Sequence, residues 1–333
     1  MINKKIAVIG SGSWGTALIK ILLHNVEEVG WWVRNQNTID YVNKHNRNPD
    51  YLPFAELQPK KLDSSTDMKY IVDKYDILIY AIPSAFLHRS IQEANLTEND
   101  FKNKIIISAI KGIVPEYNQI VAEYFKRSYG VDFNDIGIIA GPCHAEEVAM
   151  EKLSFLTIAF LDETRAQHMA DMFSTWYMKI KTSTDIAGTE YAAMIKNIIA
   201  IANGICIGLG YGDNFQAVLI VNAMREIRRF LEEVFPHNRK VMDTEYVGDL
   251  LVTSYSKYSR NRTFGTFIGN GYSVRSTMQE MKMVAEGYYA VKCLMEINKE
   301  HKVNLPITEA VYNILYQKKS PTLEMRKLSE KLT

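Results

Sequence analysis

The feature that most constrains this chain is a glycine pattern that directly follows a short apolar run near the N-terminus. After residues 6–9, Gly10, Gly12 and Gly15 occupy the first, third and sixth places of a dinucleotide-binding fingerprint. The first glycine permits a tight turn, the second lets backbone N–H groups approach a pyrophosphate, and the third allows a helix to pack closely on the strand. Residues 16–23 have a helical pattern, and a helix N-terminus favours a bound anion. The pattern predicts a nicotinamide or flavin nucleotide site, and the alternative is an ordinary strand–turn–helix.

Length, charge and cysteine content narrow the class of protein. A chain of 333 residues is long enough for about two domains with cores of their own. Lys and Arg total 39 and Asp and Glu total 38, so the net charge of +1 provides no basic excess for nucleic acid. The 3 cysteines are widely spaced and lack metal-ligand spacing, which indicates a reducing compartment and no metal site. The N-terminus makes a poor signal peptide, and no apolar stretch reaches the roughly 20 residues that span a bilayer, so we expect a cytoplasmic protein.

The first half of the chain alternates apolar runs with helical patterns. Near-continuous apolar strands separated by helical lengths are typical of a parallel sheet covered on both faces. A further pair of strands, 155–160 and 178–181, is expected to close this domain. The strands expected in the parallel part are 6–9, 29–33, 77–82, 105–109 and 136–140.

Residues that directly follow these strands are candidates for a ligand site, because ligands bind at the carboxyl edge of an open α/β sheet. Lys111 comes directly after a buried strand, which indicates an anionic ligand or an internal ion pair. Residues 141–146 follow the next strand with a glycine-containing polar sequence. Arg34 follows the second strand, where NAD sites usually carry an acidic residue, so the sequence favours or at least permits a cofactor with a 2′-phosphate.

The character of the sequence changes near residues 183–187, after which helical periods dominate. We therefore predict an α/β, Rossmann-like dinucleotide-binding domain over 1–184 and an all-α domain over 185–333. The helices expected in the second domain are 189–209, 214–235, 243–253, 276–301 and 305–316.

One of these helices carries a lysine among apolar residues. Residues 189–204 are apolar nearly all round, which predicts a buried helix, yet Lys196 and Asn197 lie at its centre. Helical spacing places Lys196 on a stripe of mostly small residues. Burial near another cation lowers a lysine pKa toward the value that a general base needs, so we predict that Lys196 is catalytic. The alternative is a lysine that reaches solvent or pairs with Glu190.

A second cluster contains residues suited to bind an anion. Arg260 and Arg262 flank Asn261 after a serine, and arginine makes planar, bidentate contacts to phosphate. A solvated basic turn at a helix boundary is an equally good interpretation of this cluster. Asp249 lies in an otherwise apolar run, so we expect it to be partnered by another side chain.

Together these segments resemble the NAD(P)-dependent glycerol-3-phosphate dehydrogenases of the bacterial type. The resemblance extends over nearly the whole chain, and its motifs occur in the family's order, which makes it more specific than the glycine pattern. The matching segments are 10–17, 109–112, 141–149, 196–201, 208–214, 248–250, 259–262 and 284–287.

The resemblance implies roles for individual residues. Lys196 is implied as the proton acceptor, with Lys111 and Asp249 beside it as further catalytic and substrate-binding residues. The implied contacts of the substrate and its phosphate are Gly141, Cys143 (where the family usually has serine), Ser259, Arg260 and Asn261. The implied cofactor contacts, besides the fingerprint glycines, are Ser13, Trp14, Arg34, Lys111, Ala145, Arg260, Val284 and Glu286.

The reaction that the resemblance implies is the reversible oxidation of sn-glycerol 3-phosphate to dihydroxyacetone phosphate with NADP or NAD. This reaction supplies glycerol 3-phosphate for phospholipid synthesis. We expect a phosphorylated triose as substrate, a homodimer, no nucleic acid partner and no membrane span. We also expect the helix of Lys196 to face the carboxyl edge of the sheet across a gap wide enough for a triose.

Two other functions remain open from the sequence. A different two-domain hydroxyacid or sugar-acid dehydrogenase would need a carboxylate site in place of a phosphate site. A redox sensor that binds NAD(P) without turnover would not need Lys111, Lys196 and Asp249 together.

Overall fold

The computed structural model describes residues 4–281 and 285–333. The chain divides into two units, of which the first contains residues up to 110 together with 121–186. The second unit contains residues 111–120 and 187–333. Residues 111–120 therefore pack with the helical unit although they lie within the sequence of the first unit, a placement for which the sequence carries no signal.

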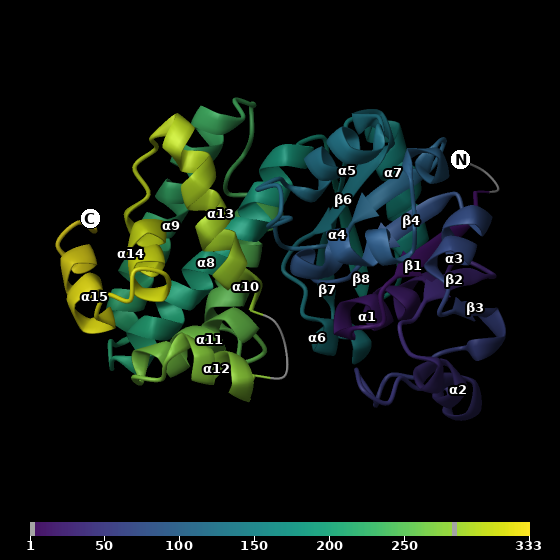
Figure 1. Cartoon of the computed structure of the whole chain (residues 1–333), viewed down its shortest axis with the longest axis horizontal. Coiled ribbons are helices and arrows are strands. Elements are labelled where there is room, and N and C mark those ends of the chain that lie inside the picture. The colour runs from purple at the N-terminus through teal and green to yellow at the C-terminus, as the bar shows by residue number, and fades with distance from the viewer. Residues whose placement is uncertain (1–3, 282–284) are drawn as a thin grey trace. The chain divides into compact units, whose positions relative to one another are not determined.

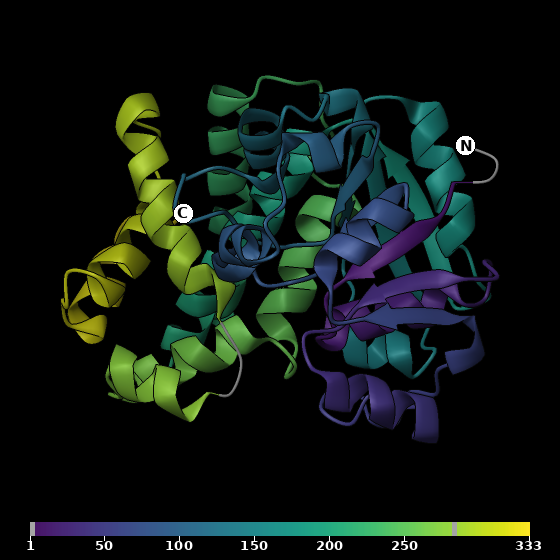
Figure 2. The same cartoon turned by 45° about the vertical axis from the view of Figure 1, so that its right-hand side comes forward.

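The first unit is built on one eight-stranded sheet, whose strands are seen in Figures 1 and 2. The strand order is β3-β2-β1-β4-β5-β6-β7-β8, and every pair is parallel except β6 with β7. β1, β4, β5 and β6 are buried along their whole length, which explains their near-continuous apolar sequences. The strands are β1 Ile6–Ile9, β2 Val29–Trp32, β3 Leu62–Ser65, β4 Ile77–Tyr80, β5 Ile105–Ser108, β6 Ile136–Ala140, β7 Ser154–Phe160 and β8 Met178–Ser183.

The strand order places a ligand site at the carboxyl ends of β1 and β4. The chain runs outward from β1 to β2 and β3, and then returns to the other side of β1 to form β4. Such a reversal opens a crevice outside the carboxyl ends of the two strands. The glycine loop follows β1 at this edge of the sheet, and residues 81–84 follow β4.

β3 is the strand that the sequence analysis missed. Its four residues are only half-buried, and as the outermost strand it pairs with β2 alone. Because its sequence, Leu-Asp-Ser-Ser, has no apolar run, its strand conformation depends on pairing rather than on its own hydrophobicity.

The helices that the structure describes in the first unit surround the sheet, and α1 packs against both α6 and α7 (Figure 1). Asp67 and Asp162 start α3 and α7, because each side chain accepts a hydrogen bond from a backbone N–H of the first turn. The helices are α1 Ser13–Leu22, α2 Gln36–His45, α3 Met68–Lys74, α4 Ser84–Glu93, α5 Val121–Tyr129, α6 Ala145–Ala149 and α7 Glu163–Phe173.

The second unit consists of helices and loops in the part of the chain that the structure describes, apart from an isolated bridge between Val114 and Gln119. A π-helical turn, Thr244–Gly248, leads directly into α10. The helices are α8 Ile186–Gly208, α9 Asp213–Val234, α10 Asp249–Tyr255, α11 Arg260–Gly269, α12 Val274–Glu280, α13 Glu286–His301, α14 Pro306–Leu315 and α15 Pro321–Ser329.

α8 and α11 approach each other closely because glycines face each other across the contact. A Cβ at Gly265 would lie 2.1 Å from the carbonyl oxygen of Ile201, and one at Gly204 would lie 2.1 Å from that of Arg262. One turn farther along, Gly208 and Gly269 make similarly close contacts. Any side chain at these positions would push the two helices apart.

The single helix predicted over 276–301 is wrong, because the structure has two helices there. α12 ends at Glu280, with Met281 extended, and α13 begins at Glu286 after an extended Ala285. The new start is stabilised by a residue far away in sequence, since Asn261 Oδ1 accepts a hydrogen bond of 2.9 Å from the backbone N–H of Gly287. The periodicity of the local sequence cannot predict a cap that comes from a residue so far away in the chain.

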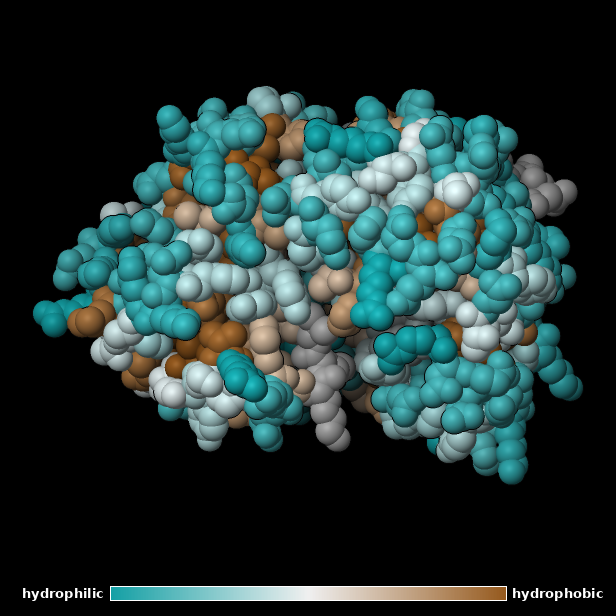
Figure 3. Space-filling model, in the orientation of Figure 1, coloured by the Kyte–Doolittle hydropathy of each residue, from teal (hydrophilic) through white to brown (hydrophobic). Residues whose placement is uncertain are grey.

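α8 is, among the described residues, the one helix long and apolar enough to cross a membrane by length and composition alone. In its most apolar stretch 89 % of the residues are buried, and its side chains form much of the core of the second unit. A helix buried in a protein core can be as long and as apolar as a helix that crosses a membrane. On the face shown in Figure 3, hydrophobic residues lie in small groups among hydrophilic ones.

Candidate active site

The glycine loop between β1 and α1 is shaped by two glycines that leave no room for a side chain. Gly10 has φ +130°, and a Cβ there would lie 2.7 Å from the carbonyl oxygen of Ala81. A Cβ at Gly15 would lie 2.2 Å from the carbonyl oxygen of Gly10. These contacts are the tight turn and the close helix–strand packing that the glycine fingerprint predicts.

Gly12 differs from its neighbours, because a Cβ there would meet no atom within 4 Å. Gly12 is the N-cap of α1, and the backbone N–H groups of Ser11, Gly12 and Ser13 donate to no residue that the structure describes. Open space beside unpaired amides at the start of a helix is a cradle that a pyrophosphate can fill. The loop therefore fits a dinucleotide cofactor.

The other predicted cofactor residues of the first unit lie at the carboxyl edge of the sheet. Trp14, in the first turn of α1, is partly buried against the hydrophobic core, and Ala145 is the first residue of α6. Arg34 follows β2 and is exposed. Its guanidinium makes no hydrogen bond or ion pair with any described residue, so it can bind an anionic group such as a 2′-phosphate.

Gly141 and Cys143 form a turn after β6 that is tied to β7. Gly141 has φ +116°, and its carbonyl oxygen accepts a hydrogen bond of 2.8 Å from the N–H of Cys143. The buried thiol of Cys143 donates to the carbonyl oxygen of Phe155 at 2.9 Å. The thiol therefore holds this turn in place, and its contact with substrate stays a prediction.

Three predicted residues meet in the second unit around one buried carboxylate. Asp249, at the start of α10, is 1 % exposed and accepts hydrogen bonds from Lys196 through Oδ1 and from Lys111 at 3.0 Å through Oδ2. Lys196, in the middle of α8, is 3 % exposed and also donates to Thr253 Oγ1 at 2.9 Å. Lys196 is thus buried in an ion pair with Asp249 and does not reach solvent.

This arrangement changes the pKa of both buried groups. Burial, which disfavours the ammonium, lowers the pKa of Lys196 to about 7; Asp249 opposes this shift and the Lys111 cation adds to it. Burial alone would raise the pKa of Asp249, but the charges of Lys111 and Lys196 hold it below its ordinary value. The carboxylate therefore stays ionised while Lys196 can exchange a proton near neutral pH.

The predicted phosphate contacts lie at the N-terminus of α11. Ser259 is the N-cap, and its side chain accepts a hydrogen bond of 3.3 Å from the N–H of Arg262. Arg260 is exposed, and its guanidinium has no partner among the described residues. Asn261 uses Oδ1 to hold Gly287, while its Nδ2 has no partner within the described part of the chain. An arginine and an amide donor in the first turn of a helix fit a phosphate.

Two predicted cofactor residues precede or begin α13. Glu286 is its first residue, one position before the Gly287 that Asn261 holds. Val284 lies outside the described residues.

Sequence reasoning missed the roles of Thr253 and Asn197. Thr253 Oγ1 contacts Asp249 Oδ1 at 3.3 Å as well as Lys196, and the signal was its position four residues after Asp249 on one helix. Asn197 Nδ2 donates to the carbonyl oxygen of Lys111 at 2.7 Å and so fixes the backbone from which Lys111 extends. No sequence pattern relates these two residues.

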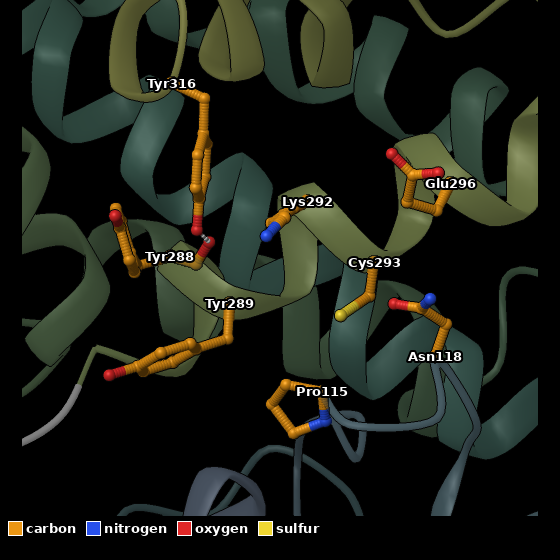
Figure 4. Close-up of a pocket in the computed structure, with 8 residues that line it drawn as sticks. All are labelled: Pro115, Asn118, Tyr288, Tyr289, Lys292, Cys293, Glu296 and Tyr316. Atoms are coloured by element: carbon orange, nitrogen blue, oxygen red, sulfur yellow. Dashed lines mark hydrogen bonds between the residues drawn. The ribbon is translucent and has the colours of Figure 1, made fainter.

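A pocket of about 560 Å³ opens beside the first half of α13 (Figure 4). None of its lining residues is among the predicted site residues, although Glu286 begins the same helix. The hydroxyl of Tyr316 donates to the carbonyl oxygen of Tyr288 at 2.8 Å, which fixes one wall. The lining residues are Pro115, Asn118, Tyr288, Tyr289, Lys292, Cys293, Glu296 and Tyr316.

Comparison with known proteins identifies the family of this chain. Residues 5–166 match the family model of the NAD-dependent glycerol-3-phosphate dehydrogenase N-terminus, and residues 185–326 match that of the C-terminus. Glycerol-3-phosphate dehydrogenase [NAD(P)+] of Bacillus pumilus is 35% identical over 317 residues, 95% of this chain and 91% of the relative. The enzyme of the same name from Staphylococcus carnosus is 34% identical over 97% of both chains.

A solved structure gives the same result. The crystal structure of glycerol-3-phosphate dehydrogenase from Coxiella burnetii has a TM-score of 0.89 and 25% sequence identity, with 98% of this chain and 99% of that chain covered. The chain therefore belongs to the NAD-dependent glycerol-3-phosphate dehydrogenase family and is an NAD(P)-dependent oxidoreductase.

Proposed function

We propose that this protein interconverts sn-glycerol 3-phosphate and dihydroxyacetone phosphate, and that Lys196 carries the proton. The observation that carries the proposal is the buried amine of Lys196, held by Asp249 beside a second lysine, Lys111. A bound nicotinamide supplies the hydride acceptor or donor. The remaining chemistry is a proton transfer at the C2 oxygen of the substrate, which falls to side chains of this chain.

The pKa of Lys196 suits transfer in both directions. In the oxidation, the neutral amine accepts the proton of the C2 hydroxyl; in the reduction, the ammonium returns a proton to the same oxygen. With its pKa at about 7, Lys196 is present in both forms at neutral pH. The Lys111 ammonium is proposed to stabilise the negative charge that develops on that oxygen, and Asp249 holds both amines in place.

The phosphate of the substrate is assigned to the first turn of α11. Arg260 and the Nδ2 of Asn261 are free to donate there, with Ser259 as the N-cap. Gly141 and Cys143 are proposed as further substrate contacts. The phosphate lies away from the reacting carbon, so its binding energy serves to position the substrate.

The cofactor is assigned to the glycine loop, with its pyrophosphate at Gly10, Gly12 and Gly15. Arg34 is proposed to contact a 2′-phosphate, because its guanidinium is exposed and unpartnered at the end of β2. We therefore expect NADPH to be accepted alongside NADH. The further proposed contacts are Ser13, Trp14, Lys111, Ala145, Arg260, Val284 and Glu286.

The proposal extends to the organisation of the protein. Residues 1–184, apart from the segment 111–120 that packs with the helical unit, are assigned to NAD(P) binding, and residues 185–333 are assigned to substrate binding and catalysis. We propose a cytoplasmic homodimer that supplies glycerol 3-phosphate for phospholipid synthesis.

The decisive experiment replaces the proposed base. Lys196→Ala should lower kcat for dihydroxyacetone phosphate reduction by a factor of about 10² to 10⁴, the usual contribution of a general acid–base group. The dissociation constant of NADPH should stay close to that of the wild type, because the amine is assigned to the substrate. Lys299→Ala is the matched control, since Lys299 is an exposed lysine of α13 that pairs with Glu296.

Three results would overturn the proposal. A near-normal kcat in Lys196→Ala would remove Lys196 as the proton carrier. Turnover of 3-hydroxy acids with no turnover of glycerol 3-phosphate would favour a hydroxyacid dehydrogenase. Tight NADPH binding without turnover of either class would favour a redox sensor.

A further inference from the structure

Asn48 is a buried residue whose side-chain amide is fully hydrogen-bonded. It lies between α2 and β3 and has 0 % exposure. Its Nδ2 donates to the carbonyl oxygen of Ser11 at 2.9 Å and to Thr16 Oγ1 at 2.9 Å. Its Oδ1 accepts from the backbone N–H groups of Asp50 at 3.1 Å and Tyr51 at 3.2 Å. Both donors and both acceptor positions of the amide are therefore occupied.

The bond to Ser11 fixes the orientation of one peptide plane in the glycine loop. In a trans peptide the carbonyl of one residue and the N–H of the next point in opposite directions. Because Asn48 holds the Ser11 carbonyl toward the protein interior, the N–H of Gly12 must point the other way. That N–H has no partner among the described residues, and the space beside Gly12 is open.

The preceding peptide is fixed in the same manner. The indole Nε1 of Trp31 in β2 donates to the carbonyl oxygen of Gly10 at 3.0 Å, and Trp31 is fully buried. Holding this carbonyl directs the N–H of Ser11 away from the bond, and that amide is also unpaired among described residues. Two successive carbonyls of the loop are thus held by buried side chains, which leaves two successive amides for an anion.

We infer that Asn48 is the positioning residue of the cofactor's pyrophosphate site: it holds the Ser11–Gly12 peptide so that the Gly12 N–H faces the phosphate oxygens. The inference rests on the proposed role of the glycine loop in cofactor binding. Asn48 itself lies beneath the loop and acts through the Ser11 carbonyl. Only an amide side chain of this length supplies one donor to Ser11 in the loop, a second donor to Thr16 in α1, and an acceptor to residues 50 and 51.

The test is Asn48→Asp, measured as the dissociation constants of NADPH and ADP-ribose by fluorescence or calorimetry at pH 8. Aspartate keeps the shape and the acceptor but loses both donors, and its carboxylate would repel the Ser11 carbonyl. We expect both dissociation constants to rise by a similar factor of roughly 10 to 100, the worth of a hydrogen bond to a charged group. In steady-state assays the KM of NADPH should rise, while kcat and the KM of dihydroxyacetone phosphate stay near wild type.

Thr16→Val is the matched control. It removes the other partner of the same Nδ2 and the longer bond of 3.5 Å from Thr16 Oγ1 to the Ser11 carbonyl, but it leaves the bond of 2.9 Å from Asn48 to that carbonyl. We expect Thr16→Val to lower the melting temperature as Asn48→Asp does, with little change in either dissociation constant. If both variants lose cofactor affinity in proportion to the fall in their melting temperatures, Asn48 stabilises the fold and does not position the pyrophosphate site. If Asn48→Asp does not fold, Asn48→Ala serves in its place, with the same expectation.

Gly12→Val separates failure of this inference from failure of the proposed cofactor site. Its side chain enters open space, so it should disturb only a ligand that lies against the loop. Weakened NADPH binding in Gly12→Val with unchanged binding in Asn48→Asp would overturn the role of Asn48 alone. Unchanged binding in both variants would overturn the assignment of the loop itself.

Discussion

At the scale of single residues, the two neighbours of Lys196 shift its pKa in opposite directions. Asp249 raises this pKa and Lys111 lowers it, while burial keeps the net value at about 7. Reduction of dihydroxyacetone phosphate needs the ammonium, so kcat for reduction should fall as the pH rises through this pKa. Replacement of Asp249 or Lys111 should therefore shift the pH at which kcat falls, each in a direction that follows from its charge.

Lys111→Met should move this fall in kcat to higher pH, because the ammonium of Lys196 loses a repelling cation. Asp249→Asn should move it to lower pH, because the ammonium loses its counter-ion while burial remains. The measurement is kcat for reduction as a function of pH at saturating substrate and NADPH, compared with the wild type. If kcat falls at the wild-type pH in both variants, the pKa of Lys196 does not determine the pH dependence of reduction.

Some of these residues could be predicted from the sequence, but their contacts could not. Lys111, Lys196 and Asp249 each stood out as a charged residue in or beside an apolar run. The structure brings Asp249 to Lys111 across 138 positions and to Lys196 across 53, and no local pattern encodes such pairings. Asn48 gave no signal at all, because its function depends on the backbone of a distant loop.

At the scale of helices and strands, predictions held where an element's own residues determine its burial. The fully buried parallel strands were visible as apolar runs, and α8 as a helix that is apolar nearly all round. β3 escaped prediction because its edge position, not its composition, makes it a strand. The break between α12 and α13 escaped because the cap of Gly287 comes from α11.

The contact between α8 and α11 is where a single methyl group should matter most. Gly265→Ala would place its Cβ 2.1 Å from the carbonyl oxygen of Ile201, so the helices must separate. Overpacking of this kind typically costs about 1–3 kcal/mol, and we expect at least this loss in the free energy of unfolding in urea. Gly212→Ser is the control, because a Cβ there meets nothing and serine is a preferred N-cap for α9. Equal stability of the two variants would contradict the close helix packing.

At the scale of the whole molecule, the path of the chain couples the folding of the second unit to a segment of the first half. Residues 111–120 lie between β5 and α5 in sequence but belong to the second unit. Ile113 and Ile120 are fully buried in its hydrophobic core, and the segment begins with Lys111. A division of the sequence into two domains at one residue, such as the predicted boundary after 184, would assign residues 111–120 to the first unit and separate them from the core in which they are buried.

A fragment of residues 187–333 should consequently be less stable than the same fragment with residues 111–120 joined to it by a flexible Gly/Ser linker. Removal of two buried isoleucines costs at least as much as two large-to-small core substitutions, about 2–5 kcal/mol each. That is a large share of the roughly 5–15 kcal/mol that stabilises a typical domain. Thermal unfolding followed by circular dichroism should show a higher and sharper transition for the joined fragment. A linked version with Ile113 and Ile120 both replaced by Ala should behave like the bare fragment, because the core contacts and not the added length provide the stability. Identical transitions for the bare and joined fragments would mean that the second unit folds without the segment that carries Lys111.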